Sequence, residues 1–303
     1  MPFALKRGCS VGVELRRLLD RQLSAAVDAL QGGPGDVRVA RRRLKKARAV
    51  LRAARPGLDD ASRSIDRQLR KAGHLLAPLA DAAAAISTLD RLRGIDPARL
   101  ADARIAALRA ALCSDAARLR SGSANLRGRA IRLLTKQREA LAGFETSACG
   151  VHSTAGAVRR ARRNGRVARR HAMAHPTMAA CHAWRRRVKV EWHLLRLLDG
   201  VTRRRLIEDE RRLEQLDGCL GDLHDLAVLQ VRVREHSALS RSATAQVLMA
   251  IRAHARDLKQ CARLLAGALD ESPRELERRI VALWLSARAP VGLVEGEARH
   301  SHA

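Results

Sequence analysis

The sequence predicts an all-α protein, and three observations support this fold class. Apolar residues recur with helical spacing along nearly all of the 303-residue chain. Clusters of β-branched residues with a period of two, which would indicate strands, are absent. Glycine, proline and serine interrupt the helical pattern at intervals, so we expect about ten helices of roughly 15–25 residues each.

The interruptions, taken in chain order, define these helices. They lie at 32–35, 55–57, 94–97, 121–123, 143–156, 175–176, Gly200 and 272–273. Asp36 and Thr177 each precede an apolar-periodic run, and we expect both to be N-caps, because such side chains accept a hydrogen bond from a free N–H of the first turn. The last dozen residues, from about Pro290, lack periodicity and are expected to be frayed.

An internal repeat indicates two homologous helical halves. With an offset of 144 residues, segment 38–52 aligns without gaps with segment 182–196. The identical positions of the first segment are Arg41, Arg42, Arg43, Lys45, Leu51 and Arg52. At the same offset, LAPLAD (76–81) aligns with LGDLHD (220–225). We therefore expect a single composite domain made of two halves, 1–150 and 151–303.

The charge balance predicts a polyanionic partner. The chain carries 59 Lys and Arg against 31 Asp and Glu, a formal net charge of +28, and both halves share the excess. So large a positive field opposes compaction through self-repulsion, which an anionic partner relieves. With two Phe, three Trp and no Tyr, the chain has few rings on which nucleic-acid bases could stack. Nucleic acid is therefore a less favoured partner, although the charge alone would suffice for it.

Two uniformly basic helix faces form the expected binding surface. On a helix with 100° per residue, the positive groups of 182–196 fall within an arc of about 100°, and those of 38–52 form a matching stripe. These groups are Arg38, Arg41, Arg42, Lys45 and Arg52 in the first half, and His182, Arg185, Arg186, Lys189, His193 and Arg196 in the second. The apolar residues of each segment lie on another face of the helix. A solvated surface usually alternates the sign of its charges, so the uniform sign favours an anion-binding site.

The pair His224-Asp225 allows a different interpretation. Such a pair on a helix, with His182 and Asp257 as further ligands, is typical of a metal-dependent phosphohydrolase. The matching positions of the first half keep only the carboxylate of Asp81, and a dication would lie unfavourably in so positive a field. We therefore favour carboxylates that orient or neutralise arginines, with His224 in contact with the ligand. Since no P-loop, GxGxxG, GxSxG or HExxH motif is present, we expect neither an enzyme nor a cofactor or metal.

The spacing of the cysteines and the length of the apolar segments indicate the cellular compartment. Six cysteines occur singly at positions 9, 113, 149, 181, 219 and 261, without a CxxC pair. This spacing argues against both a zinc site and a disulfide framework, and it indicates a reducing compartment. The first fifteen residues carry no apolar signal segment, and no uncharged apolar run approaches the length of a membrane span. We expect a soluble, cytoplasmic protein without membrane association.

Three segments resemble the signatures of one family. The strings HAWRRRVK and WHLLRLL within 182–198, and LGDLHDLAVL at 220–229, resemble the second-half motifs of the CHAD domain, the conserved histidine α-helical domain. Segment 37–48 is similar to the first-half signature of that family. The resemblance spans about residues 10–285. It implies two four-helix bundles related by a pseudo-twofold axis, with a basic central channel that binds inorganic polyphosphate, in the bacterial cytoplasm and often at polyphosphate granules.

The resemblance also implies which residues contact the ligand. These are Arg41, Arg42, Lys45 and Arg48 in the first half, and His182, Arg185, Arg186, Lys189 and His224 in the second. The chain departs from the family pattern at three positions. Arg38 stands where His is usual, Ala80 where Arg is common, and His193 where an aromatic residue is frequent. Arg38 makes the positive charge independent of pH, so phosphate binding survives these departures.

The expected function is therefore non-enzymatic binding of inorganic polyphosphate in a basic central groove. Sequence-nonspecific nucleic-acid binding is the first alternative, because the net charge suffices for it. A metal-dependent phosphohydrolase that uses His224 and Asp225 is the second.

Overall fold

The chain folds into helices joined by short connections. The computed structural model describes residues 3–33, 36–54, 60–101, 103–141, 149–235 and 240–286, and these residues form eleven helices and no strand. The all-α fold class that the sequence predicts is thereby confirmed. The fraying expected from about Pro290 onward falls on residues outside the described part of the chain.

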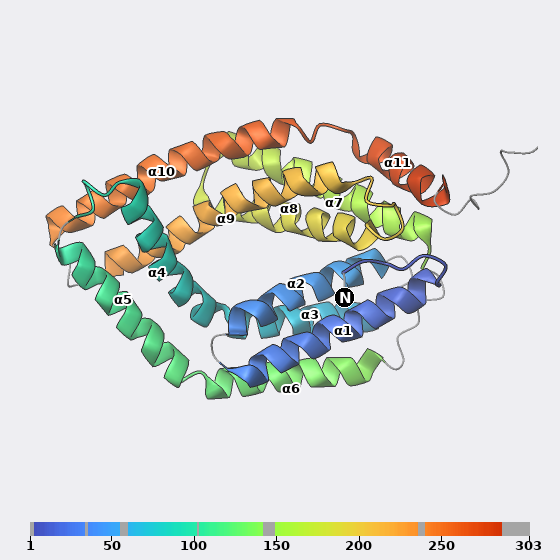
Figure 1. Ribbon diagram of the computed structural model, residues 1–303, viewed down its shortest axis with the longest axis horizontal. Helices are drawn as coiled ribbons and strands as arrows, with labels where there is room; N and C mark the ends of the chain where they lie inside the picture. Colours follow the sequence, from blue (N-terminus) through green and yellow to red (C-terminus); the bar gives the residue numbers. More distant parts are fainter. Residues whose placement is uncertain are drawn as a thin grey trace, which may run out of the picture.

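The helices form two layers, one above the other in the view of Figure 1. Their bounds are α1 Val11–Gly32, α2 Val37–Ala54, α3 Asp60–Leu75, α4 Ala77–Ile95, α5 Ala103–Ser121, α6 Ala124–Ala140, α7 Val151–Ala174, α8 Met178–Leu198, α9 Ile207–Glu235, α10 Arg241–Gly267 and α11 Pro273–Ser286. In the view of Figure 1, α1, α2, α3 and α6 pack together below, and α7 to α11 pack together above. α2 also packs against α7 and α8, while α4 packs against α9, so the layers join through α2 and α4. That a pseudo-twofold axis relates the two groups, and that they divide near residue 150, stay predictions.

Most helix ends lie where the sequence breaks predict them. α1 ends at Gly32, α4 at Ile95 and α5 at Ser121, while α11 begins at Pro273. Thr177 is the N-cap of α8, as expected, because its hydroxyl accepts a hydrogen bond from the Ala180 N–H (3.1 Å). The boundaries therefore follow local turn chemistry that is legible in the sequence.

One bend is absent from the sequence expectation. α3 and α4 meet at Leu76, between Leu75 and Ala77, and the two helices are bent by 49°. Pro78 lies in the first turn of α4. Because proline lacks an N–H and its ring clashes with the carbonyl four residues earlier, it ends α3 and starts a new helix without any glycine.

The apolar faces of α2 and α8 are buried as their periodicity predicts. The buried apolar residues are Val37, Ala40, Leu44, Ala47 and Leu51 of α2 and Trp184, Val188 and Leu195 of α8. These side chains belong to a hydrophobic core that runs through both layers. Their burial fixes the rotation of both helices and thereby the direction of the basic stripes.

Within the described residues, no single helix combines the length and the apolar character of a membrane span. Segments Ser62–Leu75 and Ala77–Ile95 meet that test only as a bent pair.

Candidate functional site

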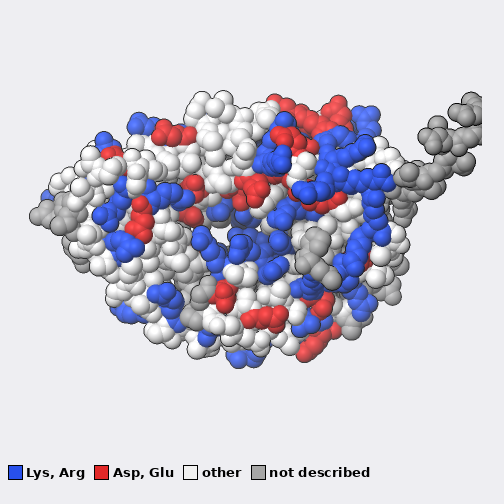
Figure 2. All heavy atoms as spheres, in the orientation of Figure 1, with Lys and Arg blue, Asp and Glu red and all other residues white. Residues whose placement is uncertain are grey.

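α2 and α8 bring basic side chains of both stripes together. Burial, followed by repulsion from Lys189, Arg185 and Arg41, lowers the pKa of Lys45 to about 7. Lys45 lies on α2 and both Lys189 and Arg185 on α8, so charges from two separate segments of the chain act on one another at close range. Figure 2 shows one face of the molecule with a hollow near its centre and Lys and Arg side chains around the hollow. The predicted convergence of the two stripes is present at these residues.

One carboxylate of α9 holds the two α8 cations in place. Asp217 accepts a hydrogen bond from Nε of Arg185 (3.4 Å) and another from Nζ of Lys189. Its side chain is only 11% exposed, so these contacts are largely shielded from water. Asp217 pairs with Arg185 and Lys189, and its charge also acts on Lys45. Because one carboxylate faces three cations, the site keeps an excess of positive charge.

Gly221 lets Arg185 lie directly against α9. A Cβ atom at this position would stand 2.8 Å from Nη2 and 3.2 Å from Cζ of Arg185. Since real Cβ atoms essentially never come as close as 2.8 Å to another heavy atom, any larger residue would displace the guanidinium. The glycine of the LGDLHD segment thus positions a cation of the neighbouring helix.

Two further ion pairs connect α4 to this region. Nη1 of Arg41 on α2 lies 3.4 Å from Oδ1 of Asp81, and Nη1 of Arg91 lies 2.7 Å from Oδ1 of Asp222 on α9. Asp81 therefore neutralises an arginine, as the sequence interpretation favours. Asp225 has a pKa that burial raises, and the charges of Arg185, Arg91 and Arg38 counteract this rise.

The two histidines at the site are held in their neutral form. The rings of His182 and His224 lie 4.4 Å apart between centroids. Burial, followed by repulsion from His224 and then Arg186, lowers the pKa of His182 to about 4. Burial and then Arg185 lower the pKa of His224 as well. Both rings are therefore uncharged at neutral pH and can donate or accept hydrogen bonds, but they add no positive charge.

We use the name basic cluster for six residues of α2, α8 and α9 that these interactions link. They are Arg41, Lys45, His182, Arg185, Lys189 and His224. All six are intermediate in exposure, neither sealed in the core nor fully in solvent. The basic cluster is thus partly desolvated but still open to a ligand.

Other predicted residues take different positions. Nε of Arg48 donates to Asp66 of α3 (2.7 Å), and Arg52 donates to the Arg48 carbonyl (2.8 Å), so both are engaged within the lower layer. His193 is 5% exposed and its ring stacks on that of Trp192, so it is buried and does not lie on the open face of the stripe. Arg196 lies over the Trp192 ring, 5.3 Å from its centroid. Arg38, Arg42 and Arg186 are exposed.

Sequence reasoning missed several contributors to the site. Asp217, Gly221 and Asp222 of α9 and Arg91 of α4 lie outside both basic stripes. Asp217 stands four residues before Gly221, so both share one face of α9 with the LGDLHD segment. That spacing is a usable signal for Asp217. No comparable signal exists for Arg91, because its partner Asp222 lies 131 residues away.

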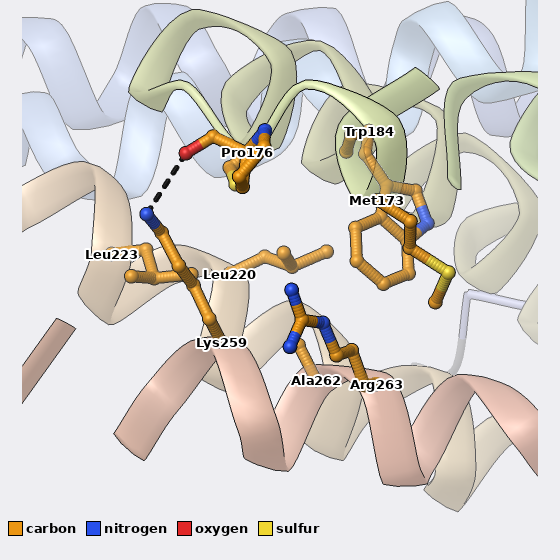
Figure 3. Close-up of a pocket in the computed structure, with 10 residues that line it drawn as sticks. Met173, Pro176, Trp184, Leu220, Leu223, Lys259, Ala262 and Arg263 are labelled. Atoms are coloured by element: carbon orange, nitrogen blue, oxygen red, sulfur yellow. Dashed lines mark hydrogen bonds between the residues drawn. The ribbon is translucent and has the colours of Figure 1, made fainter. Parts of the chain in front are cut away.

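A small pocket outside the basic cluster is mostly apolar. Figure 3 shows Trp184, Leu220 and Leu223 at this pocket, with Lys259 donating to the Pro176 carbonyl (2.9 Å). None of the thirteen predicted binding residues lines it. The described ranges also contain no group of three or more His, Cys, Asp or Glu side chains that could hold a metal ion.

Comparison with known proteins identifies a family for this chain. A family model described as CHAD domain matches residues 15–234, which is more than two thirds of the chain. No curated protein sequence matches the chain. The matched range contains the whole basic cluster together with Asp81, Asp217 and Gly221.

Proposed function

The chain belongs to the CHAD domain family, and from this premise we propose that it binds inorganic polyphosphate, without converting it, at the basic cluster. The observation that carries the proposal is the meeting of Lys45 with Arg185 and Lys189 around one buried carboxylate. A folded chain keeps such a repulsive arrangement where a ligand of opposite charge relieves it.

The energetics favour a ligand with many closely spaced anionic oxygens. A charge-assisted hydrogen bond contributes about 1.5–3 kcal/mol where it is shielded from water. The guanidinium of Arg185 can bind two phosphate oxygens at once, and Lys45 and Lys189 each supply a point charge. A polyphosphate chain accepts hydrogen bonds from several such donors along its length, so the summed free energy of these contacts outweighs the entropic cost of ordering the polymer.

The aromatic residues favour polyphosphate over single-stranded nucleic acid. Within the described residues, Phe3, Trp184 and Trp284 are buried. Trp192 is covered by Nζ of Lys189, 5.5 Å from its centroid, and by the guanidinium of Arg196. Because unspecific binders of single strands stack bases on open rings, this surface suits a phosphate polymer without bases.

A competition titration tests the choice of polymer. Fluorescently labelled polyphosphate is bound to the protein near physiological salt, then displaced by unlabelled polyphosphate, duplex DNA or triphosphate at equal phosphate concentration. We expect long-chain polyphosphate to displace the label at the lowest concentration. Displacement by DNA at a lower concentration would instead support the nucleic-acid alternative.

A double substitution tests the site. Arg185→Gln with Lys189→Gln removes two charge-assisted contacts, so we expect polyphosphate affinity to fall by about 100-fold or more. Gln is chosen over Glu because a further carboxylate would repel Asp217. The matched control is Arg274→Gln with Arg278→Gln, an exposed pair with the same spacing on α11.

Circular dichroism separates a binding defect from a folding defect in these variants. The proposal predicts unchanged helical content in both and lost binding only in the first. Equal affinity of the two variants contradicts it. We also expect no phosphate release from polyphosphate with Mg²⁺ or Mn²⁺; release that His224→Ala abolishes would restore the phosphohydrolase alternative.

A further inference from the structure

Two cysteines that are far apart in the sequence touch in the fold. Cys219 lies on α9 and Cys261 on α10, and their Sγ atoms are 2.9 Å apart. The packing of α9 against α10 brings these two positions together, although they lie 42 residues apart in the sequence. A disulfide bond requires an S–S distance of about 2.05 Å, so only a small approach separates the two thiols from bonding.

The other four cysteines lack such a partner. All six cysteines belong to the described part of the chain, and no second thiol pair in contact is found there. Cys149 and Cys181 are buried, and burial raises the pKa of both thiols. Cys9 is exposed but pairs with no other cysteine. Among the cysteines of the described residues, Cys219 and Cys261 are thus the one pair whose thiols touch.

The two thiols differ in exposure and in charge environment. Cys261 is exposed, whereas Cys219 is half-buried. Burial, the hydrogen bond with Cys261 and the nearby carboxylate of Asp222 raise the pKa of Cys219 to about 12. Because Cys261 is the exposed thiol and burial disfavours the Cys219 thiolate, Cys261 is the member of the pair that meets a dissolved oxidant first.

We propose that Cys219 and Cys261 form a reversible disulfide that joins α9 to α10 when the protein meets a small-molecule disulfide oxidant such as oxidised glutathione. The Cys261 thiolate attacks one glutathione sulfur, an S–S bond forms between them, and the first glutathione leaves as a thiolate that takes up the proton Cys261 released. Cys219 then attacks the Cys261 sulfur, and the second glutathione leaves with the proton from Cys219. Two protein thiols are oxidised, and one glutathione disulfide is reduced to two thiols.

Peptide mapping of the native full-length chain tests this step. The protein is incubated with oxidised glutathione, the remaining thiols are alkylated, and the digest is analysed by mass spectrometry without reduction. We expect a cross-linked peptide pair that contains Cys219 and Cys261, and its loss after dithiothreitol. A glutathione adduct on exposed Cys9 without any link between Cys219 and Cys261 overturns the proposal, because it shows that the oxidant acted.

Serine variants distinguish the thiol that attacks the oxidant from the thiol that resolves the mixed disulfide. Cys219→Ser leaves no resolving thiol, so we expect a persistent glutathione adduct on Cys261. Cys261→Ser should give neither link nor adduct at position 219. Cys181→Ser is the matched control and should keep the link. Persistent adducts on both single variants at equal yield contradict the assigned order of attack.

A thermal melt tests whether the disulfide between Cys219 and Cys261 forms in the undistorted native structure. Cross-linking restricts the unfolded chain, so the oxidised wild-type protein should unfold at a higher temperature than the reduced protein. The increase should vanish with dithiothreitol and be missing from Cys261→Ser. A lower melting temperature on oxidation overturns the proposal, because it means that the link forms only in a distorted structure.

Discussion

At Lys45, burial and repulsion act in the same direction. Both disfavour the ammonium form, and the pKa of this side chain falls from 10.5 to about 7. Near neutral pH the site therefore holds a lysine that is only partly charged. A bound phosphate oxygen reverses the balance, because it stabilises the ammonium and raises the pKa in the complex.

This residue predicts a pH dependence of binding. Above pH 7 the free protein loses the Lys45 proton and the complex keeps it, so binding takes up protons and affinity falls as pH rises from 7 towards 10. One proton corresponds to a decrease of at most about tenfold per pH unit. Lys45→Arg should flatten the profile, since arginine stays charged, while the exposed control Lys136→Arg should not. Titrations between pH 6 and 9 provide the measurement, and an unchanged slope in Lys45→Arg contradicts the assignment.

Asp217 has two opposing effects on the site. Its carboxylate stabilises Arg185 and Lys189 in the free protein and competes with phosphate for the same donors. We predict that Asp217→Asn binds polyphosphate several-fold more tightly, but lowers the free energy of unfolding by about 1–3 kcal/mol, because partly buried cations lose their partner. Titration and thermal melts measure the two effects. Weaker binding in this variant would mean that Asp217 mainly orients the cations for the ligand.

The helices show which features local sequence determines. Thr177 and Pro273 mark helix starts by their own chemistry, and the sequence predicts both. The bend at Leu76 was not predicted, since a proline in the first turn of a helix was the sole local signal. Helix number and boundaries are thus largely local information, whereas the packing of α4 on α9 depends on residues far apart in the chain.

On α9, two glycines provide a matched comparison. A Cβ at Gly221 would displace Arg185, whereas one at Gly218 meets nothing within 4 Å. We predict that Gly221→Ala weakens polyphosphate binding several-fold and that Gly218→Ala leaves it unchanged. Alanine favours helix over glycine by about 1 kcal/mol, so neither variant should unfold more readily. Equal affinities of the two variants would show that the position of Arg185 is not critical.

For the molecule as a whole, the sequence predicted which helix faces are basic, but not which other helices pack against those faces. The helical wheel placed Lys45, Arg185 and Lys189 on uniformly basic faces, and the fold brings them together. The same wheel placed His193 on the stripe, yet its ring is buried against Trp192. A periodic pattern gives the direction of a side chain on its own helix, but the other helices decide whether that direction opens to ligand, to an ion pair or to the core.

Lysine footprinting tests most directly whether polyphosphate occupies the basic cluster. The chain has seven lysines, and Lys45 and Lys189 belong to the basic cluster, whereas Lys136 is exposed on α6. Acetylation of the native protein with and without polyphosphate is quantified at each lysine by mass spectrometry. We predict that polyphosphate reduces acetylation of Lys45 and Lys189 several-fold and leaves Lys136 unchanged. Equal protection of all three lysines, or protection of Lys136 alone, would contradict binding at the basic cluster.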